Sequence, residues 1–131
     1  MKTKNIISLV LRLVAALIML QTLYFKFTAQ PESVYIFSQV GIEPWGRIAT
    51  GAAELIASIL LLIPATIVLG ALLSIGVMMG AIVTHLFVLG IEVQGDGGQL
   101  FMYATIVLVT SIVLLFIHKD QFMKYWRMAF R

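Results

Sequence analysis

A carboxylate in the middle of an apolar stretch is the first feature of this sequence that could do chemistry. Glu54 lies in "TGAAELIASILLLIP", residues 50–64, ten residues after Pro44. At a helical rise of about 1.5 Å per residue, Glu54 would lie ~15 Å below the start of a membrane helix, near the bilayer midplane. An isolated acid at that depth costs at least ~2.5 kcal/mol, so we expect it to be paired or protonated.

Polar side chains in the neighbouring apolar stretches could meet this carboxylate. Lys26 closes the first stretch in "QTLYFKF", and His85 lies in "GAIVTHLFVLG" near the end of the third. Counted along helices, these residues lie nearer the same membrane face, so one polar pocket between that face and the midplane is the economical arrangement. The predicted ligand-binding residues are Gln21, Tyr24, Lys26, Glu54, His85 and Tyr103.

The same residues also allow interpretations without a ligand. Glu54 could form a structural pair with His85 or with Lys26, whereas Lys26 alone would more often extend its ammonium to the lipid headgroups. His85 could be a hydrogen-bonded structural residue, and the tyrosines could belong to an aromatic belt at the membrane interface. Small neighbours on the helix, such as Gly51 and Ala57, indicate that Glu54 faces protein rather than lipid.

No complete catalytic constellation is present, and the sequence leaves open whether the protein is an enzyme. The chain has no cysteine, which excludes thiolate catalysis, disulfide exchange and iron–sulfur ligation by its own residues. His85 and His118 lie toward opposite membrane faces, so we expect no metal site. The net charge of +3 is better explained by basic residues that face anionic lipid than by nucleic acid.

The composition places these residues in a membrane protein. Of 131 residues, 61% are apolar and 11% are charged, a balance that leaves too little polar surface for a soluble domain of this size. Four apolar stretches are each long enough to cross a hydrocarbon core of about 30 Å as a helix. We therefore predict an all-α integral membrane protein, a four-transmembrane-helix bundle in one domain over residues 1–131, with helices at residues 6–25, 45–63, 67–89 and 100–117.

Basic residues decide the predicted orientation. Lys2, Lys4 and Arg12 lie near the amino end, whereas the two long loops are mainly acidic. Lysine and arginine near helix ends favour the cytoplasmic side, so we expect both termini in the cytoplasm, with the protein in a bacterial inner membrane. Four further cations close the chain: Lys119, Lys124, Arg127 and Arg131.

Shorter sequence features accompany the four helices. "PESVYIFSQVG" begins with Pro31 and ends in Gly41, which predicts a short amphipathic helix over the outer end of the bundle. "HKDQFMKYWRMAFR" places basic and aromatic side chains on two faces, as expected of an interfacial C-terminal helix in the headgroup layer. Gly76 and Gly80 form a small-xxx-small stripe that predicts close helix packing, within the bundle or between copies.

Nearly the whole chain resembles the DoxX-like family of small four-helix membrane proteins. The resemblance is carried by "LRLVAALIMLQTLYFKF" with its closing lysine, by "FSQVGIEPWGRIATGAAELIASILLLIP", and by "GAIVTHLF" with its histidine. The second segment is similar to the family pattern that places an acid in helix two, at Glu54. Because the family name derives from a subunit of a thiosulfate:quinone oxidoreductase and other members are associated with membrane redox complexes, the resemblance implies an accessory or quinone-linked role.

Three functions follow as hypotheses. The first is a small accessory subunit of a membrane redox or respiratory complex, whose outer-half pocket binds a quinone-like ligand without any covalent cofactor. The second is a small proton-coupled transporter in which Glu54 alternates between a proton and a substrate. The third is a structural subunit whose polar residues only lock the bundle. In each case we expect the lipid bilayer as a partner, together with further copies of the chain or other subunits, and no nucleic acid.

Overall fold

Helices make up all the regular structure in residues 2–130, which the computed structural model describes. Four of them are long and apolar enough to cross a membrane, which confirms the predicted four-helix architecture. The long helices are α1 (Thr3–Phe27), α3 (Trp45–Leu62), α4 (Ile67–Thr84) and α5 (Gln99–Ile117). The shorter elements are α2 (Pro31–Val40), a 3-10 turn η1 (Pro64–Thr66), a π-helical turn η2 (His85–Leu89) and α6 (Lys119–Ala129).

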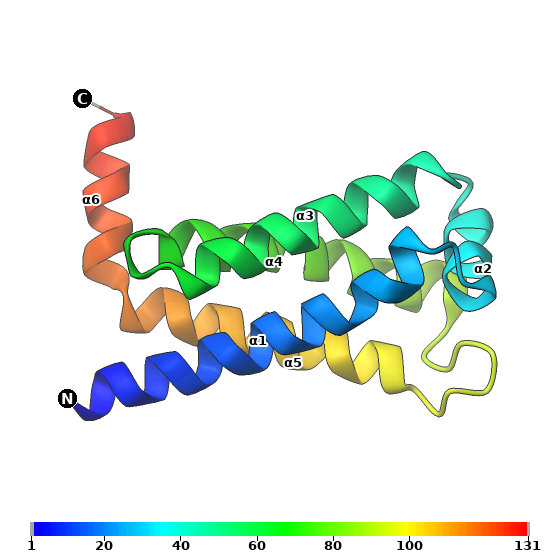
Figure 1. The fold of residues 1–131 in the computed structure, drawn as a ribbon, viewed down its shortest axis with the longest axis horizontal. Helices are drawn as coiled ribbons and strands as arrows, with labels where there is room; N and C mark the ends of the chain where they lie inside the picture. The colour runs from blue at the N-terminus through cyan, green and yellow to red at the C-terminus, as the bar shows by residue number, and fades with distance from the viewer. Residues whose placement is uncertain (1, 131) are drawn as a thin grey trace.

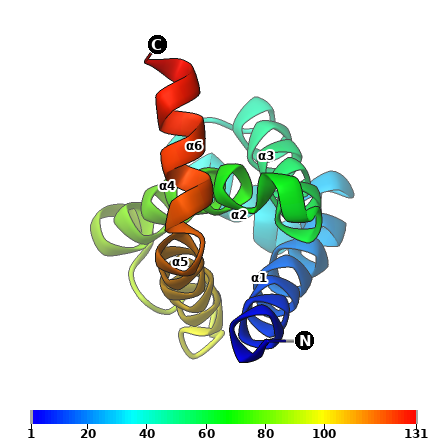
Figure 2. The same cartoon turned by 90° about the vertical axis from the view of Figure 1, so that its left-hand side faces the viewer.

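The four long helices form a closed ring in which each packs against two others. α1 lies between α3 and α5, and α4 packs against the same two helices (Figure 2). Both ends of the chain lie at one end of the bundle, which we call the terminal end (Figure 1). The opposite end carries α2 and the loop of residues 90–98, and we call it the loop end.

Small residues keep the interior of the bundle narrow. Ala57 and Ala71 are fully buried beside Met19 and Leu61. At Gly70, α4 approaches α3 so closely that an added Cβ would lie 2.7 Å from the backbone nitrogen of Leu61. Large apolar side chains point outward, where only lipid would solvate them favourably. They include Leu17, Ile56, Phe87, Met102 and Phe116. This pattern is that of a multi-pass membrane protein.

The short helix α2 lies across the loop end. Pro31 and Glu32 occupy its first turn, where the fixed φ of proline and a negative charge both favour a helix N-terminus. The helix ends at Gly41, whose φ of 84° is a left-handed conformation that glycine adopts without strain. Its buried residues are Ser33 and Phe37, so this face of α2 covers the loop end of the bundle.

The last helix, α6, leaves the terminal end at a steep angle to the bundle (Figure 1). Gln121 ties it to the turn between α3 and α4, because its Nε2 donates to Pro64 O (2.9 Å) and its Oε1 accepts from Val68 N (2.7 Å). Tyr125 Oη donates to Ala65 O at 2.5 Å. The direction of α6 is therefore set by contacts with the α3–α4 turn as well as by its connection to α5.

One carboxylate organises the loop between η2 and α5. Asp96 Oδ1 accepts hydrogen bonds from the backbone nitrogens of Val93 (3.0 Å) and Gly98 (2.8 Å), and Oδ2 accepts one from that of Leu100 (3.3 Å). Partial burial alone would raise the pKa of Asp96. The three hydrogen bonds stabilise the charged form and, together with nearby His85, hold the pKa of Asp96 below its ordinary value.

We predict that Asp96→Ala accelerates amide hydrogen exchange across residues 90–98 by about ten-fold, because hydrogen bonds to a charged acceptor each contribute about 1.5 kcal/mol. In the native chain, this protection is complete above the ordinary aspartate pKa of about 3.9 and is lost as the pH falls through the lower pKa of folded Asp96. Hydrogen exchange followed by mass spectrometry measures both effects. Glu92→Ala, at an exposed acid of the same loop, is the control, and equal exchange in the native and Asp96→Ala proteins would contradict the prediction.

Candidate functional site

A cavity of about 600 Å³ lies in the loop-end half of the bundle, between α1, α2, α3, α4 and α5. α3 and α4 touch at Gly70, whereas farther along they contribute small residues to the cavity wall, among them Ala53, Gly76 and Gly80. A Cβ added at Gly76 or at Gly80 would meet no atom within 4 Å. The predicted close packing of this glycine stripe within the bundle is therefore wrong. The missing side chains widen the cavity instead.

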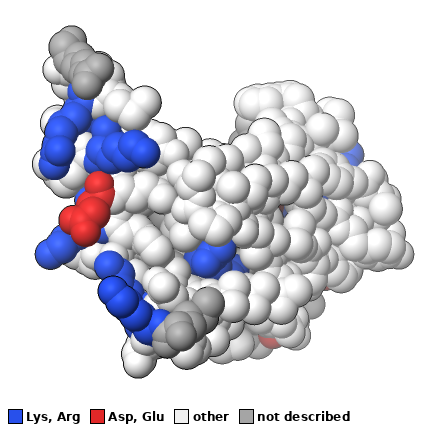
Figure 3. Space-filling view, turned by 60° about the vertical axis from the view of Figure 1, so that its left-hand side comes forward, with Lys and Arg blue, Asp and Glu red and all other residues white. Residues whose placement is uncertain are grey.

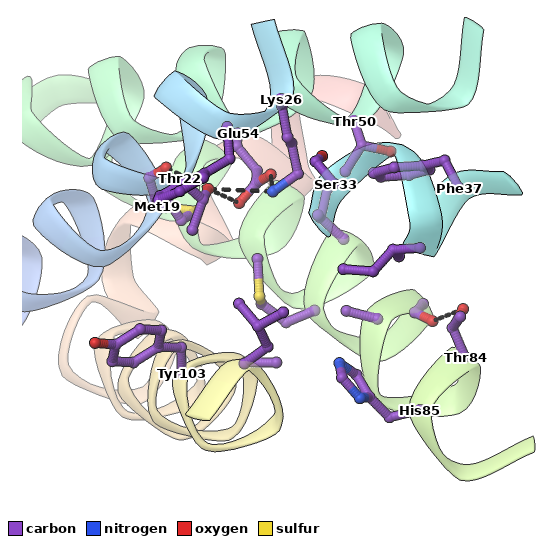
Figure 4. A pocket seen from close by; sticks show the side chains of 18 of the residues that line it. Met19, Thr22, Lys26, Ser33, Phe37, Thr50, Glu54, Thr84, His85 and Tyr103 are labelled. Atoms are coloured by element: carbon purple, nitrogen blue, oxygen red, sulfur yellow. Dashed lines mark hydrogen bonds and ion pairs between the residues drawn. The ribbon is translucent and has the colours of Figure 1, made fainter. Parts of the chain in front are cut away.

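The polar wall of the cavity is an ion pair with a threonine beside it (Figure 4). Lys26 Nζ lies 2.7 Å from Glu54 Oε1. Lys26 Nζ also donates to Thr22 Oγ1 (3.1 Å), and Thr22 Oγ1 lies 3.2 Å from Glu54 Oε2 and 2.8 Å from Met19 O. The single hydroxyl proton of Thr22 serves one of these two acceptors at a time. Three side chains from α1 and α3 thus form one connected group.

Burial makes this pair different from a surface salt bridge. The side chain of Glu54 is 3% exposed and that of Lys26 is 16% exposed. Lys26 therefore does not extend its ammonium to the headgroups, as we expected of it alone, because the buried carboxylate offers a stronger partner. Of the two structural pairs that the sequence allowed for Glu54, the structure forms the one with Lys26.

The carboxylate of Glu54 is neutralised within the protein. Glu54 Oε1 is buried and lies 2.7 Å from the ammonium of Lys26, a charge-assisted contact, and Oε2 lies 3.2 Å from Thr22 Oγ1. Lys26 and Thr22 are only partly buried. A ligand in the cavity would therefore meet this group through the ammonium of Lys26 and the hydroxyl of Thr22.

A second buried cation holds the end of α1 against α3. Arg47 Nε donates to both carboxylate oxygens of Glu43, at 2.9 and 3.1 Å. Arg47 Nη1 also donates to the backbone oxygen of Lys26. Arg47 is buried, and its contact with the backbone of Lys26 fixes where the last turn of α1 sits. Arg47 therefore helps to position the lysine that pairs with Glu54.

His85 occupies the wall opposite the ion pair, with its ring turned toward the cavity (Figure 4). It begins the π-helical turn η2, a distortion that is often found at functional sites. Its Nδ1 lies 3.0 Å from Gly90 O, and its ring stands edge-on to that of Phe101, with 5.6 Å between centroids. Because Nδ1 is occupied, Nε2 is the nitrogen left for a ligand.

The structure brings together five of the six residues that we predicted from the sequence. Gln21, Lys26, Glu54, His85 and Tyr103 all line the cavity. Tyr24 does not line it, because its side chain is 62% exposed and stands edge-on against Phe25. Tyr24 lies on a different face of α1 from Thr22 and Lys26, so we leave it out of the candidate site.

Several lining residues were missed by the sequence analysis. Thr22 lies four residues before Lys26, and this i, i+4 spacing on a helix was the signal that could have identified it. Ser33 and Phe37 come from α2, so they could be assigned only once that helix was known to cover the cavity. No group of three or more His, Asp or Glu residues within residues 2–130 is arranged to hold a metal ion.

The comparison with protein families assigns the chain. A model described as the DoxX-like family matches residues 10–114. The chain belongs to the DoxX-like family. The match runs from α1 into α5 and includes every lining residue of the cavity. Neither the search of curated proteins nor the search of solved structures returned a match. Membership identifies this DoxX-like protein as a membrane protein and leaves its reaction and partners to be inferred from the site.

We predict a strong coupling between the two partners of the ion pair. Lys26→Met should destabilise the protein by about 3 kcal/mol, because it leaves the buried Glu54 carboxylate without its counter-charge. Lys26→Met combined with Glu54→Leu should recover most of that loss, since no charge is then buried. Chemical unfolding in detergent micelles, followed by circular dichroism, measures both variants. Additive effects of the two substitutions would mean that the pair is not coupled in the folded protein.

Proposed function

We propose that this DoxX-like protein is an accessory subunit of a membrane redox complex and that its loop-end cavity binds a quinone-like ligand. The observation that carries the proposal is the connected group of Thr22, Lys26 and Glu54, a buried ion pair whose ammonium lies on the wall of a largely apolar cavity. Ligand pockets commonly combine apolar walls with a few converging polar groups. Family membership supports a quinone-linked role but does not specify it.

The polar groups of the cavity match both redox forms of a quinone. The ammonium of Lys26 can donate to a carbonyl oxygen of the oxidised form. His85 Nδ1 donates to Gly90 O, so Nε2 of the neutral ring can accept from a hydroxyl group of the reduced form. Since Lys26 and Glu54 compensate each other's charge, a neutral head group is favoured over an ion in this low-dielectric setting.

An apolar tail can leave the cavity between α3 and α4. Ala49, Gly76 and Gly80 line the cavity and are exposed. All three are small, so the wall between the two helices is thin and open at this level. The surface around this opening would face lipid, and a hydrocarbon tail could therefore extend into the bilayer while the head stays inside.

Packing at the terminal end argues for binding rather than passage. Ala57, Leu61 and Leu114 are fully buried beyond the cavity, with a few buried hydroxyls, such as those of Ser58 and Ser111, among them. A proton-coupled transporter would need a continuous polar route past these apolar side chains, so we do not extend the proposal to transport. In the structural alternative, the polar residues only hold the helices together. This alternative predicts no ligand binding, so the following binding experiment distinguishes it from the proposed function.

We predict that the purified protein in lipid nanodiscs binds a short-tailed ubiquinone analogue, as measured by isothermal titration calorimetry. Glu54→Gln should weaken binding by about ten-fold, because it removes the charge that holds the ammonium of Lys26 at the cavity wall. Gly80→Leu should weaken it to a similar degree by filling the opening between α3 and α4. Because Glu54→Gln breaks a buried ion pair and lowers stability, circular dichroism first establishes that each variant is folded at the temperature of the titration.

Ala52→Leu is the matched control for the glycine variant. Ala52 lies on α3 and is exposed, but it does not line the cavity, so added volume there should leave quinone affinity unchanged. A native protein that does not bind the analogue would refute the proposed ligand. Unchanged affinity in a correctly folded Glu54→Gln protein would show that the ion pair is structural only.

A further inference from the structure

We propose that the terminal end carries a second binding site, which takes the phosphate group of an anionic phospholipid. The site is a cavity of about 410 Å³ between α1, the α3–α4 turn and the end of α5, separate from the loop-end cavity. It is lined by Asn5, Ser8, Leu9, Arg12, Pro64, Ile67 and His118. Its central group is a buried arginine, Arg12, that pairs with no acidic residue within residues 2–130.

Arg12 is only 8% exposed although it carries a full charge. Its Nε donates to Leu61 O (2.6 Å) and its Nη2 donates to Leu62 O (3.2 Å), so it binds the last carbonyls of α3. A guanidinium has five N–H donors, and these two bonds leave others available. The ion pairs found in residues 2–130 involve Lys26 and Arg47, not Arg12. A buried cation needs an anion to offset its loss of hydration.

The neighbours of Arg12 are suited to a phosphate group. Ser8 is buried, and its Oγ lies 2.6 Å from His118 Nε2. Burial, and to a smaller extent the charges of Lys4 and Arg12, lower the pKa of His118. The two nearby cations themselves give this corner a positive potential that an anion would neutralise. Asn5, Ser8 and Arg12 follow each other at i, i+3 and i+7, so α1 presents them on one face. Together they offer hydroxyl, amide, imidazole and guanidinium groups to one ligand.

The position of the cavity points to a lipid as the source of the phosphate. Basic side chains gather over the terminal end (Figure 3). Of the six acidic residues, only Asp120, on α6, lies at this end. The other five lie in α2, α3 and the loops of the loop end. The cavity lies beside the ends of α3 and α5, where membrane-spanning helices meet the headgroup layer. Leu9 and Ile67 complete its wall with apolar surface for the start of an acyl chain.

Native mass spectrometry of the gently solubilised protein tests the proposal. The native protein should retain phosphatidylglycerol in preference to phosphatidylcholine. Arg12→Gln should reduce that retention by about ten-fold, because a charge-assisted hydrogen bond to phosphate is lost. Lys124→Gln, which removes an exposed cation of α6, should leave retention unchanged. If Lys124→Gln loses as much lipid as Arg12→Gln, the binding is diffuse attraction to surface charge and the proposed site is refuted.

A second variant separates the lipid site from the structural role of Arg12 at the end of α3. Asn5→Trp fills the cavity from an exposed position and leaves the hydrogen bonds of Arg12 to Leu61 and Leu62 intact. It should fold normally and still lose phosphatidylglycerol. Native retention in the Asn5→Trp protein would overturn the proposal. Excess inorganic phosphate should fail to displace the lipid; displacement would overturn the assignment to a lipid headgroup and point to the free anion.

Discussion

The structure depends on the requirement that a carboxylate inside an apolar bundle must not stand alone. Glu54 is 2% exposed, and hydration is unavailable at this depth, so its charge must be offset by protein groups. Lys26 supplies the counter-charge and Thr22 a hydrogen-bonding hydroxyl. Both come from the last turns of α1, and Arg47 ties those turns to α3. The loop-end half of α1 is therefore tied to α3 by polar contacts.

Because polar contacts hold the loop end, apolar packing is not needed to fill it. The bundle uses glycine in two opposite ways on the same helix. At Gly70 the absence of a side chain lets α4 touch α3, whereas at Gly76 and Gly80 it leaves open space. The helices are consequently tight at the terminal end and separated at the loop end, where α2 covers the gap. α4 thus packs closely against α3 at one point and forms one wall of the cavity at another. The cavity lies beside the ion pair of Lys26 and Glu54.

Most of the fold could be predicted from hydrophobic length, because a lipid-embedded backbone has few alternatives to the helix. Glu54 and its small neighbours also indicated the buried face of α3. The details of the site depended on rotation about helix axes, which a sequence constrains weakly in apolar segments. Tyr24 and Lys26 are two residues apart and point to different faces, and the partner of His85 proved to be the backbone of Gly90. For the glycine stripe, close packing within the bundle was wrong because the spacing is compatible with either a contact or a cavity, whereas packing between copies stays a prediction.

The two ends of the bundle solve the problem of buried charge differently. At the loop end the cation and the anion both belong to the chain, so the cavity beside them is nearly neutral and selects for polarity and shape. At the terminal end the hydrogen-bond partners of Arg12 within residues 2–130 are helix carbonyls, and the partial negative charge of a helix C-terminus is about half an elementary charge. The remaining positive potential must be balanced from outside the chain. A phospholipid would do so at the surface where α6 crosses the bundle, which would make the lipid a structural component of this end.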